Sequence, residues 1–248
     1  MHITQLAGPG TQIIHLRNHF MQTAAPTPII ETKIVMSDPT ALGVLGLAMV
    51  TFVAASAKMG WTTGVVYLIP WALFLGAVAQ IWASSIDFKK NNYIGAIVLG
   101  AYGLFWISVA MHWSISLGWF GAVGDKADPR QLGVACVGYF IFSLFVMIAA
   151  MEANKVFFAM VLLINILLPA LALSIFGVNP PLFTKIAAFA ELGISLLGFY
   201  CSGAVFLNSF FGRQLLSLGK PFGIIRKGPL LQPVNVAAPD TARPAAQR

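Results

Sequence analysis

The stretch SSIDFKKNNYIG, residues 84–95, gathers charged and amide side chains in a chain that has few of them elsewhere. It contains, in order, Asp87, Lys89, Lys90, Asn91 and Asn92. The apolar runs on either side, residues 64–86 and 93–113, are each long enough to cross a bilayer core of about 30 Å as a helix. A polar cluster between two such runs is typical of a short loop at a membrane surface.

Composition places the whole chain in the same class. Only 9% of the residues are charged, 58% are hydrophobic, and the mean hydropathy is +0.82. The surface of a soluble protein of this length needs far more charge. The net charge of +7 does not indicate a nucleic-acid partner, because the basic residues flank the apolar runs, where they encode orientation in membrane proteins. We therefore expect an all-α integral membrane protein whose surroundings are the lipid bilayer.

Six stretches are long and apolar enough to span a membrane as helices, and none alternates as a barrel strand does. They cover residues 40–57, 64–86, 93–113, 132–151, 156–176 and 186–211. An even number of spans puts both termini on one side of the membrane. This arrangement predicts a flexible N-terminal segment over residues 1–36, a six-helix membrane domain over 37–213, and a mostly disordered tail over 214–248.

The basic residues predict the orientation of these spans. The side that holds both termini and the 84–95 loop carries eleven Lys and Arg residues, and the other side carries four. Those four are Lys58, Lys126, Arg130 and Lys185. The positive-inside rule then places both termini in the cytoplasm, and the chain in the cytoplasmic membrane as a multi-pass protein.

Polar residues inside the spans are candidates for function, because burying them in hydrocarbon is costly. Glu191, Ser195, Gly198 and Ser202 are spaced to share one face of the last span. Glu191 either carries a proton on a conduction path or is a hydrogen-bonded packing residue near the interface. In the second span Gln80 either lines a pore or bonds to a neighbouring helix.

Two further spans contain features that suit a narrow pathway. Tyr102 is followed by Gly103, so the ring either closes a gate between closely approaching backbones or packs against glycine. In the fifth span, Pro169 removes the hydrogen bond to the carbonyl of Asn165, which makes Ile164 and Asn165 plausible pathway positions.

Sequence signatures of enzymes are missing from the chain. It has no H-E-x-x-H, C-x-x-C or G-x-S-x-G motif and no glycine-rich phosphate loop. Its four histidines lack metal-ligand spacing, and Cys136 and Cys201 lie inside apolar runs as small packing residues. We expect no catalytic activity, no cofactor and no metal.

The block GAVAQIWASSIDFKKNNYIGAIVLGAYGLFW, residues 76–106, resembles a conserved block of the acetate uptake transporter family. That family comprises bacterial and archaeal succinate–acetate permeases and fungal acetate and ammonium transport proteins. The segment FLNSFFGRQLLSLG, residues 206–219, is similar to the end of the family's membrane domain. The resemblance covers roughly residues 37–219. It implies six spans, cytoplasmic termini, and a hexamer in which each protomer has its own pathway.

The resemblance also assigns roles to particular residues. The family's hydrophobic constriction falls on Leu47, Tyr102 and Ile164, and Gln80 matches a family glutamine.

The family's entrance motif corresponds to DPTALGVLGL, residues 38–47, in which Pro39, Leu42 and Gly43 match. Asp38 replaces an asparagine of the motif, and its negative charge should disfavour a carboxylate nearby.

Taken together, the residues and the resemblance predict transport of acetate, succinate or a similar small carboxylate. No Lys or Arg lies deep in a span, so hydrogen-bond donors or protonation must offset the substrate's charge. Proton coupling, with Glu191 as the proton carrier, would let the substrate pass as the neutral acid.

Two other functions stay open at this point. The first is an uncoupled channel for ammonia, urea or acetic acid, whose flux would be linear and independent of a proton gradient. The second is a membrane scaffold or sensor with no flux.

Overall fold

The computed structural model describes residues 36–225 and residue 228. The predicted N-terminal segment, apart from Met36, lies outside this range, as do residues 226–227 and 229–248. Within the described residues the chain is all-helical and contains six helices long and apolar enough to cross a membrane, as predicted. These are Thr40–Lys58 (α2), Leu68–Lys89 (α3, η1 and α4), Tyr93–Ser116 (α5), Arg130–Met151 (α6), Lys155–Ile175 (α7) and Pro180–Phe210 (α8).

The second span is built from three pieces. A single turn, α3 (Leu68–Trp71), leads into the π-helix η1 (Ala72–Ala79), and α4 (Gln80–Lys89) completes the span. A π-helix bonds each N–H to the carbonyl five residues earlier, and such segments are frequent at functional sites. Gln80 therefore lies at the junction where the backbone returns to α-helical geometry, which hydrophobic periodicity alone does not predict.

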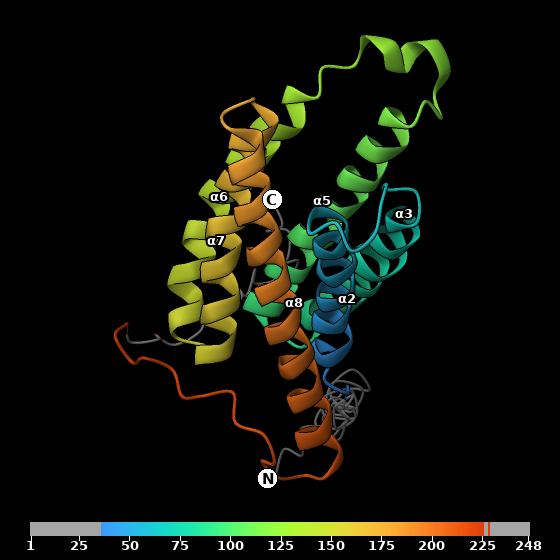
Figure 1. The fold of residues 1–248 in the computed structure, drawn as a ribbon. Helices are drawn as coiled ribbons and strands as arrows, with labels where there is room; N and C mark the ends of the chain where they lie inside the picture. Colours follow the sequence, from blue (N-terminus) through green and yellow to red (C-terminus); the bar gives the residue numbers. More distant parts are fainter. Residues whose placement is uncertain (1–35, 226–227, 229–248) are drawn as a thin grey trace, which may run out of the picture. The chain divides into compact units, whose positions relative to one another are not determined.

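Close packing of α2 against its neighbours organises the bundle. Figure 1 shows α2 and α8 side by side, although they are the first and last spans. At Gly198 of α8 the site of a missing Cβ lies 2.8 Å from the Ala48 Cβ of α2. At Gly46, also of α2, a Cβ would overlap the carbonyl oxygen of Leu75 in η1. Small residues at these positions let the helix backbones approach, as is common inside membranes.

Two spans begin four or more residues away from their predicted starts, whereas the starts of the other four agree to within two residues. The last helix begins at Pro180, six residues before the predicted boundary at residue 186. Hydropathy falls at Lys185, but the helix continues through it, because an exposed lysine extends its ammonium towards water while its stem stays apolar. The second span begins at Leu68 rather than at residue 64, since Gly64 has a left-handed φ of 77°.

The segment after α8 packs back onto the bundle. The Asn208 side chain accepts hydrogen bonds from the N–H groups of Leu215 and Leu216, which turns the chain at the end of the helix. Farther on, Val156 N–H donates to Leu218 O, and Phe222 N–H donates to Met151 O. Residues 214–225 are therefore attached to the turn between α6 and α7, although composition predicted disorder there (Figure 1).

Candidate substrate pathway

The three predicted constriction residues come from three different helices, and all three belong to the buried hydrophobic core of the described residues. Leu47 of α2, Tyr102 of α5 and Ile164 of α7 are 8%, 4% and 5% exposed. We call this the constriction band. Side chains this buried leave no open pore at these positions.

A cavity of about 280 Å³ lies on one side of the band, and we call it the charged vestibule. Aromatic and aliphatic side chains of α5, α6 and α7 form most of its wall. Its polar lining residues are Lys58, His112, Cys136, Ser174, Thr184 and Glu191.

A second cavity, of about 190 Å³, lies on the other side of the band, and we call it the neutral vestibule. Its polar lining residues are Thr40, Asn92, Asn154 and Cys201, and none of its lining residues is charged. The remaining lining positions are apolar side chains and Gly95. Leu218, from the segment after α8, also lines this cavity.

The order of residues along each helix shows that the band separates the two vestibules. On α5, Leu99 lines the neutral vestibule, Phe105 lines the charged one, and Tyr102 lies between them. Ile164 lies in the same way between Phe157 and Leu167 on α7. At 1.5 Å of rise per residue, the closed part of the path along α5 is about 9 Å long.

A buried ion pair joins α2 and α8 at the charged vestibule. The Lys58 ammonium donates to both carboxylate oxygens of Glu191, over 2.9 and 3.0 Å. Glu191 is 2% exposed, whereas the Lys58 side chain is 21% exposed. The corrected start of α8 places Glu191 about three turns into the helix, deeper than its distance from residue 186 indicated.

Lys58 is a site residue that the sequence reasoning missed. It was counted only as a loop charge beyond the first span, because it follows the predicted end at residue 57. A lysine one residue past an apolar run, together with a carboxylate inside another span, is the signal that could have suggested the pair.

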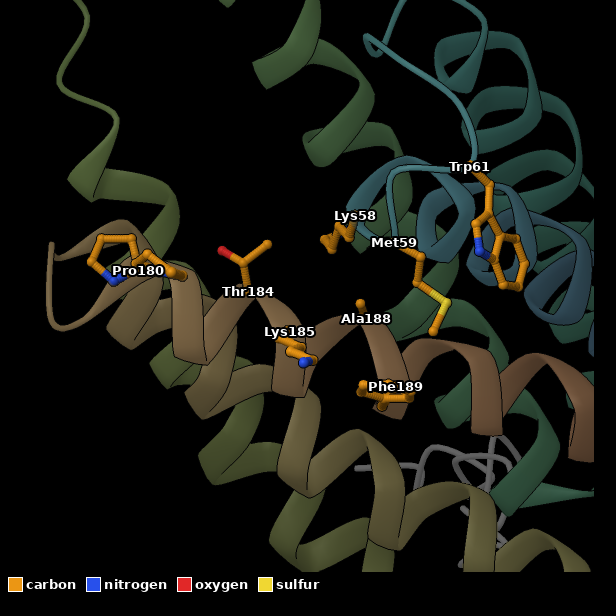
Figure 2. Close-up of a pocket in the computed structure, with 9 residues that line it drawn as sticks. Lys58, Met59, Trp61, Pro180, Thr184, Lys185, Ala188 and Phe189 are labelled. Carbon is orange, nitrogen blue, oxygen red and sulfur yellow. The ribbon is translucent and has the colours of Figure 1, made fainter.

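A larger, more open pocket of about 510 Å³ adjoins this pair, and we call it the rim pocket. Figure 2 shows Lys58, Trp61, Thr184, Lys185 and Phe189 around it. Lys58 and Thr184 line both the rim pocket and the charged vestibule. The ion pair therefore lies where the two cavities meet.

Hydrogen bonds hold the constriction band on its α6 side. The Tyr102 hydroxyl donates to Ser143 Oγ over 2.9 Å, and the Asn165 amide donates to Ser143 O over 3.3 Å. The same amide donates to Val161 O over 2.9 Å. The tyrosine is thus fixed by a polar network as well as by packing.

Two amide oxygens near the band have no hydrogen-bond partner within the described part of the chain. Gln80 donates from its amide to Gly76 O over 2.7 Å, and its buried Oε1 accepts nothing. Asn165 Oδ1 is buried in the same way, on the residue that follows Ile164. A buried acceptor without a donor is unfavourable. Acetic acid or ammonia can donate to such an oxygen, whereas a carboxylate cannot.

The remaining residues on the face of Glu191 pack against α2 or bond within their own helix. Ser202 donates to Ala41 O over 2.7 Å, and Ser195 donates to Leu192 O over 2.8 Å. Gly198 is in contact with α2, as described above. Of this face, Glu191 reaches the charged vestibule.

The predicted entrance motif begins α2 beside the neutral vestibule. Asp38 accepts from Thr40 N–H over 3.0 Å, and one of its oxygens lies 4.0 Å from the Lys90 ammonium, which offsets its charge. Pro39 is buried and Leu42 is 42% exposed. Gly43 gives Leu99 and Ala83 room to approach. The lining of the vestibule at this point comes from Thr40 rather than from these residues.

Residues 36–225 contain no candidate metal site and no disulfide. No group of three or more His, Cys, Asp or Glu side chains there is arranged to hold a metal ion. The two cysteines are free and lie on opposite sides of the band, Cys136 in the charged vestibule and Cys201 in the neutral one.

Comparison with known proteins assigns the chain to a family. The family described as GPR1/FUN34/yaaH matches residues 20–219. The chain belongs to the GPR1/FUN34/yaaH family. This family matches the one that the motifs at residues 76–106 and 206–219 indicated.

Individual relatives are distant, and the matched share of their length differs. The succinate-acetate/proton symporter SatP of Escherichia coli K12 is 25% identical over 186 residues, covering 75% of this chain and 96% of SatP. Ammonia transport outward protein 2 of Saccharomyces cerevisiae is 26% identical over 149 residues, covering 57% of this chain and 50% of the yeast protein. A solved structure of the bacterial acetate channel SatP superposes with a TM-score of 0.69, at 24% identity, over 75% of this chain and all of SatP.

These similarities confirm the predicted fold class. This member of the GPR1/FUN34/yaaH family is an all-α, multi-pass membrane protein with the fold of SatP.

Proposed function

We propose that this protein moves acetate or a similar small monocarboxylate across the cytoplasmic membrane, through a narrow pathway in each protomer. The observation that carries the proposal is the pair of vestibules on opposite sides of the closed constriction band. Two cavities separated by about 9 Å of closely packed side chains suit a transporter or gated channel whose path opens when those side chains move. SatP, which has the same fold, is described both as a succinate-acetate/proton symporter and as an acetate channel.

The substrate crosses the band as a neutral acid. Neither the band nor the neutral vestibule supplies a cation, and a bare carboxylate in a low-dielectric passage is very unfavourable. The free oxygens of Gln80 and Asn165 accept a hydrogen bond from a protonated acid and repel a carboxylate. A proton must therefore join the substrate before the band.

Orientation and assembly are part of the same proposal. The positive-inside rule places the neutral vestibule at the cytoplasm and the charged vestibule outside, with both termini cytoplasmic. The family resemblance assigns a hexamer with one pathway in each protomer. Such a transporter needs no catalytic residue or cofactor.

A second candidate is an uncoupled channel for ammonia or another small neutral solute. The uncharged lining of the neutral vestibule suits such a solute, and the similarity to an ammonia transport protein of yeast supports it. In this mechanism no proton accompanies the solute.

Radiolabelled acetate uptake into proteoliposomes, with and without an inward proton gradient, tests the proposal. We expect saturable uptake that increases with the gradient. Tyr102→Ala removes the ring from the band and should raise flux through it, with Tyr102→Phe as the matched control that keeps the ring. Linear flux that ignores the gradient would favour the neutral-solute channel. Absence of any flux of acetate or ammonia would contradict both.

A further inference from the structure

In the ion pair, Lys58 binds the Glu191 carboxylate as a cation would bind a small carboxylate ligand. The Lys58 ammonium donates to both oxygens of a carboxylate, over 2.9 and 3.0 Å, and that carboxylate belongs to the protein. Acetate carries the same group with the same charge and geometry. The Lys58 ammonium therefore already binds a carboxylate, which is the group that an arriving acetate would present.

The position of the pair makes exchange feasible. Lys58 lines both the rim pocket and the charged vestibule, so an anion entering either cavity can reach its ammonium. The Lys58 side chain is 21% exposed, whereas Glu191 is 2% exposed. The lysine can turn towards an incoming anion, whereas the more deeply buried glutamate stays at the cavity wall, where a proton from the cavity can reach it.

Exchange has a consequence for Glu191. If Lys58 turns to another carboxylate, Glu191 becomes a buried charge without its cation, which is strongly unfavourable. Taking up one proton from the cavity removes that charge and leaves a neutral acid. Conversely, a protonated Glu191 no longer competes for the ammonium.

We propose that Lys58 and Glu191 form a proton-linked anion site, in which Lys58 binds the substrate carboxylate when Glu191 has taken up a proton. The inference rests on the proposed function for its substrate and specifies how the pathway recognises that substrate. The proton moves from the aqueous cavity to a Glu191 oxygen, and no other covalent bond changes. When the substrate leaves towards the band, it can take this proton and cross as the neutral acid, and the ion pair forms again.

Other titratable groups near the pair define the controls. His112 of α5 and Cys136 of α6 line the same vestibule, and Lys185 of α8 lines the rim pocket. The lining residues from α7 are uncharged. Histidine titrates between pH 5 and 8, so His112 is the alternative source of any pH dependence.

The coupling between proton binding and anion binding predicts how strongly acetate affinity depends on pH. Proton and anion binding must favour each other by the same factor, because coupling between two sites is reciprocal. If each anion takes up one proton, affinity falls about tenfold for each unit of rising pH. Carboxyl groups titrate near pH 4, so acetate itself stays almost fully ionised between about pH 6 and 8.

The test measures acetate binding and proton uptake together, on the purified full-length protein in detergent. Isothermal titration at pH 6, 7 and 8 gives the affinity, and a pH indicator in weak buffer gives the protons taken up. The unmodified protein should bind about tenfold more weakly per pH unit and take up close to one proton per acetate. Glu191→Gln, which mimics the neutral acid, should bind tightly at every pH without proton uptake.

Three further variants separate this mechanism from a simpler charge effect. Lys58→Met should bind weakly at every pH. The double variant with Lys58→Met and Glu191→Gln should behave in the same way, and it leaves no unpaired buried charge that could prevent folding. Lys185→Met removes a charge of the same sign from the rim pocket and should keep both the pH dependence and the proton uptake.

Several results would overturn the inference. Proton uptake that persists in Glu191→Gln, or that disappears in a His112→Gln variant, would assign the proton to another group. Tight, pH-dependent binding by Lys58→Met would exclude the lysine as the anion ligand. Acetate flux in proteoliposomes together with any of these results would leave the proposed function standing. A lack of both flux and binding would remove the function as well.

Discussion

The two vestibules differ in charge, although both belong to the pathway that we propose. The charged vestibule contains the Lys58–Glu191 pair and His112, while the neutral vestibule offers uncharged polar groups such as Asn92 and Asn154. In the proposed mechanism, a carboxylate is recognised as an anion in the first, but only a neutral molecule crosses readily to the second. Selection and passage would then use separate regions, with the constriction band between them.

The largest expected effect is in thiol labelling, in which each vestibule should be accessible from one side of the membrane only. The chain has only two cysteines, Cys136 in the charged vestibule and Cys201 in the neutral one, so each Cys→Ser variant reports on one cavity. A small, membrane-impermeant reagent should modify Cys136 only from outside and Cys201 only from the cytoplasm. Because both side chains are buried, the reaction will be slow and should be followed over time by mass spectrometry. Equal labelling from both sides would mean that the closed band does not separate the cavities.

Stability should respond unequally to the two halves of the ion pair. Lys58→Met leaves Glu191 without its cation and should lower the free energy of unfolding by about 3–5 kcal/mol. Glu191→Gln should lower it by only on the order of 1 kcal/mol, because the partly exposed Lys58 can turn to water in the cavity. Thermal unfolding in detergent measures both, with Lys185→Met as a control within about 0.5 kcal/mol. Equal losses would mean that Glu191 also reaches water when it is unpaired.

Asn154, a polar residue of the neutral vestibule, should contribute to stability and not to acetate binding. Asn154 accepts from Phe157 N–H over 2.8 Å and caps the first turn of α7. Asn154→Ala should lower the free energy of unfolding by about 1 kcal/mol, whereas Asn154→Ser should retain the cap. The acetate affinity of Asn154→Ser should match that of the unmodified protein. A reduced affinity would mean that the neutral vestibule also selects the anion.

The smallest effect belongs to an ion pair outside both cavities. Arg130 donates hydrogen bonds from its side chain and backbone to Asp128, which lowers the pKa of that carboxyl. A lowered folded-state pKa stabilises the protein above the unfolded value, and this contribution is lost as pH falls through the folded value, below about pH 4. The pair is exposed, so Asp128→Asn should barely change the melting temperature at pH 7. A change comparable to that of Lys58→Met would indicate that this pair is more than a surface contact.

Hydropathy predicted the six spans because each apolar run is long and is bounded by a polar residue, glycine or proline. It misplaced the start of α8, because Lys185 interrupts the apolar pattern without interrupting the helix. Glu191 was recognisable as a buried carboxylate, but its partner was not, since Lys58 lies 133 residues earlier in the chain. Finding that pair requires the adjacency of α2 and α8, which side-chain periodicity does not encode.

Two other features were beyond sequence reasoning for different reasons. The π-helix Ala72–Ala79 depends on backbone hydrogen bonding that apolar composition does not specify. The attachment of residues 214–225 depends on main-chain groups such as the N–H of Phe222, which every non-proline residue carries. Spacing suggested Tyr102 and Ile164 as pathway positions, whereas their assignment with Leu47 to one constriction came from family resemblance and remains a prediction.

The pairing of the first and last spans also has a consequence for biosynthesis. α2 emerges from the ribosome early, yet the helix that packs against it along Ala48 and Ala41 is α8, the last to be made. At about 5–20 residues per second, roughly eight to thirty seconds separate the synthesis of Lys58 from that of Phe210. During that interval Lys58 has no Glu191, and α2 presents the small residues of its α8-facing surface to lipid or to the insertion machinery. A nascent chain stopped before Pro180 contains five of the six spans and still has no enclosed pathway.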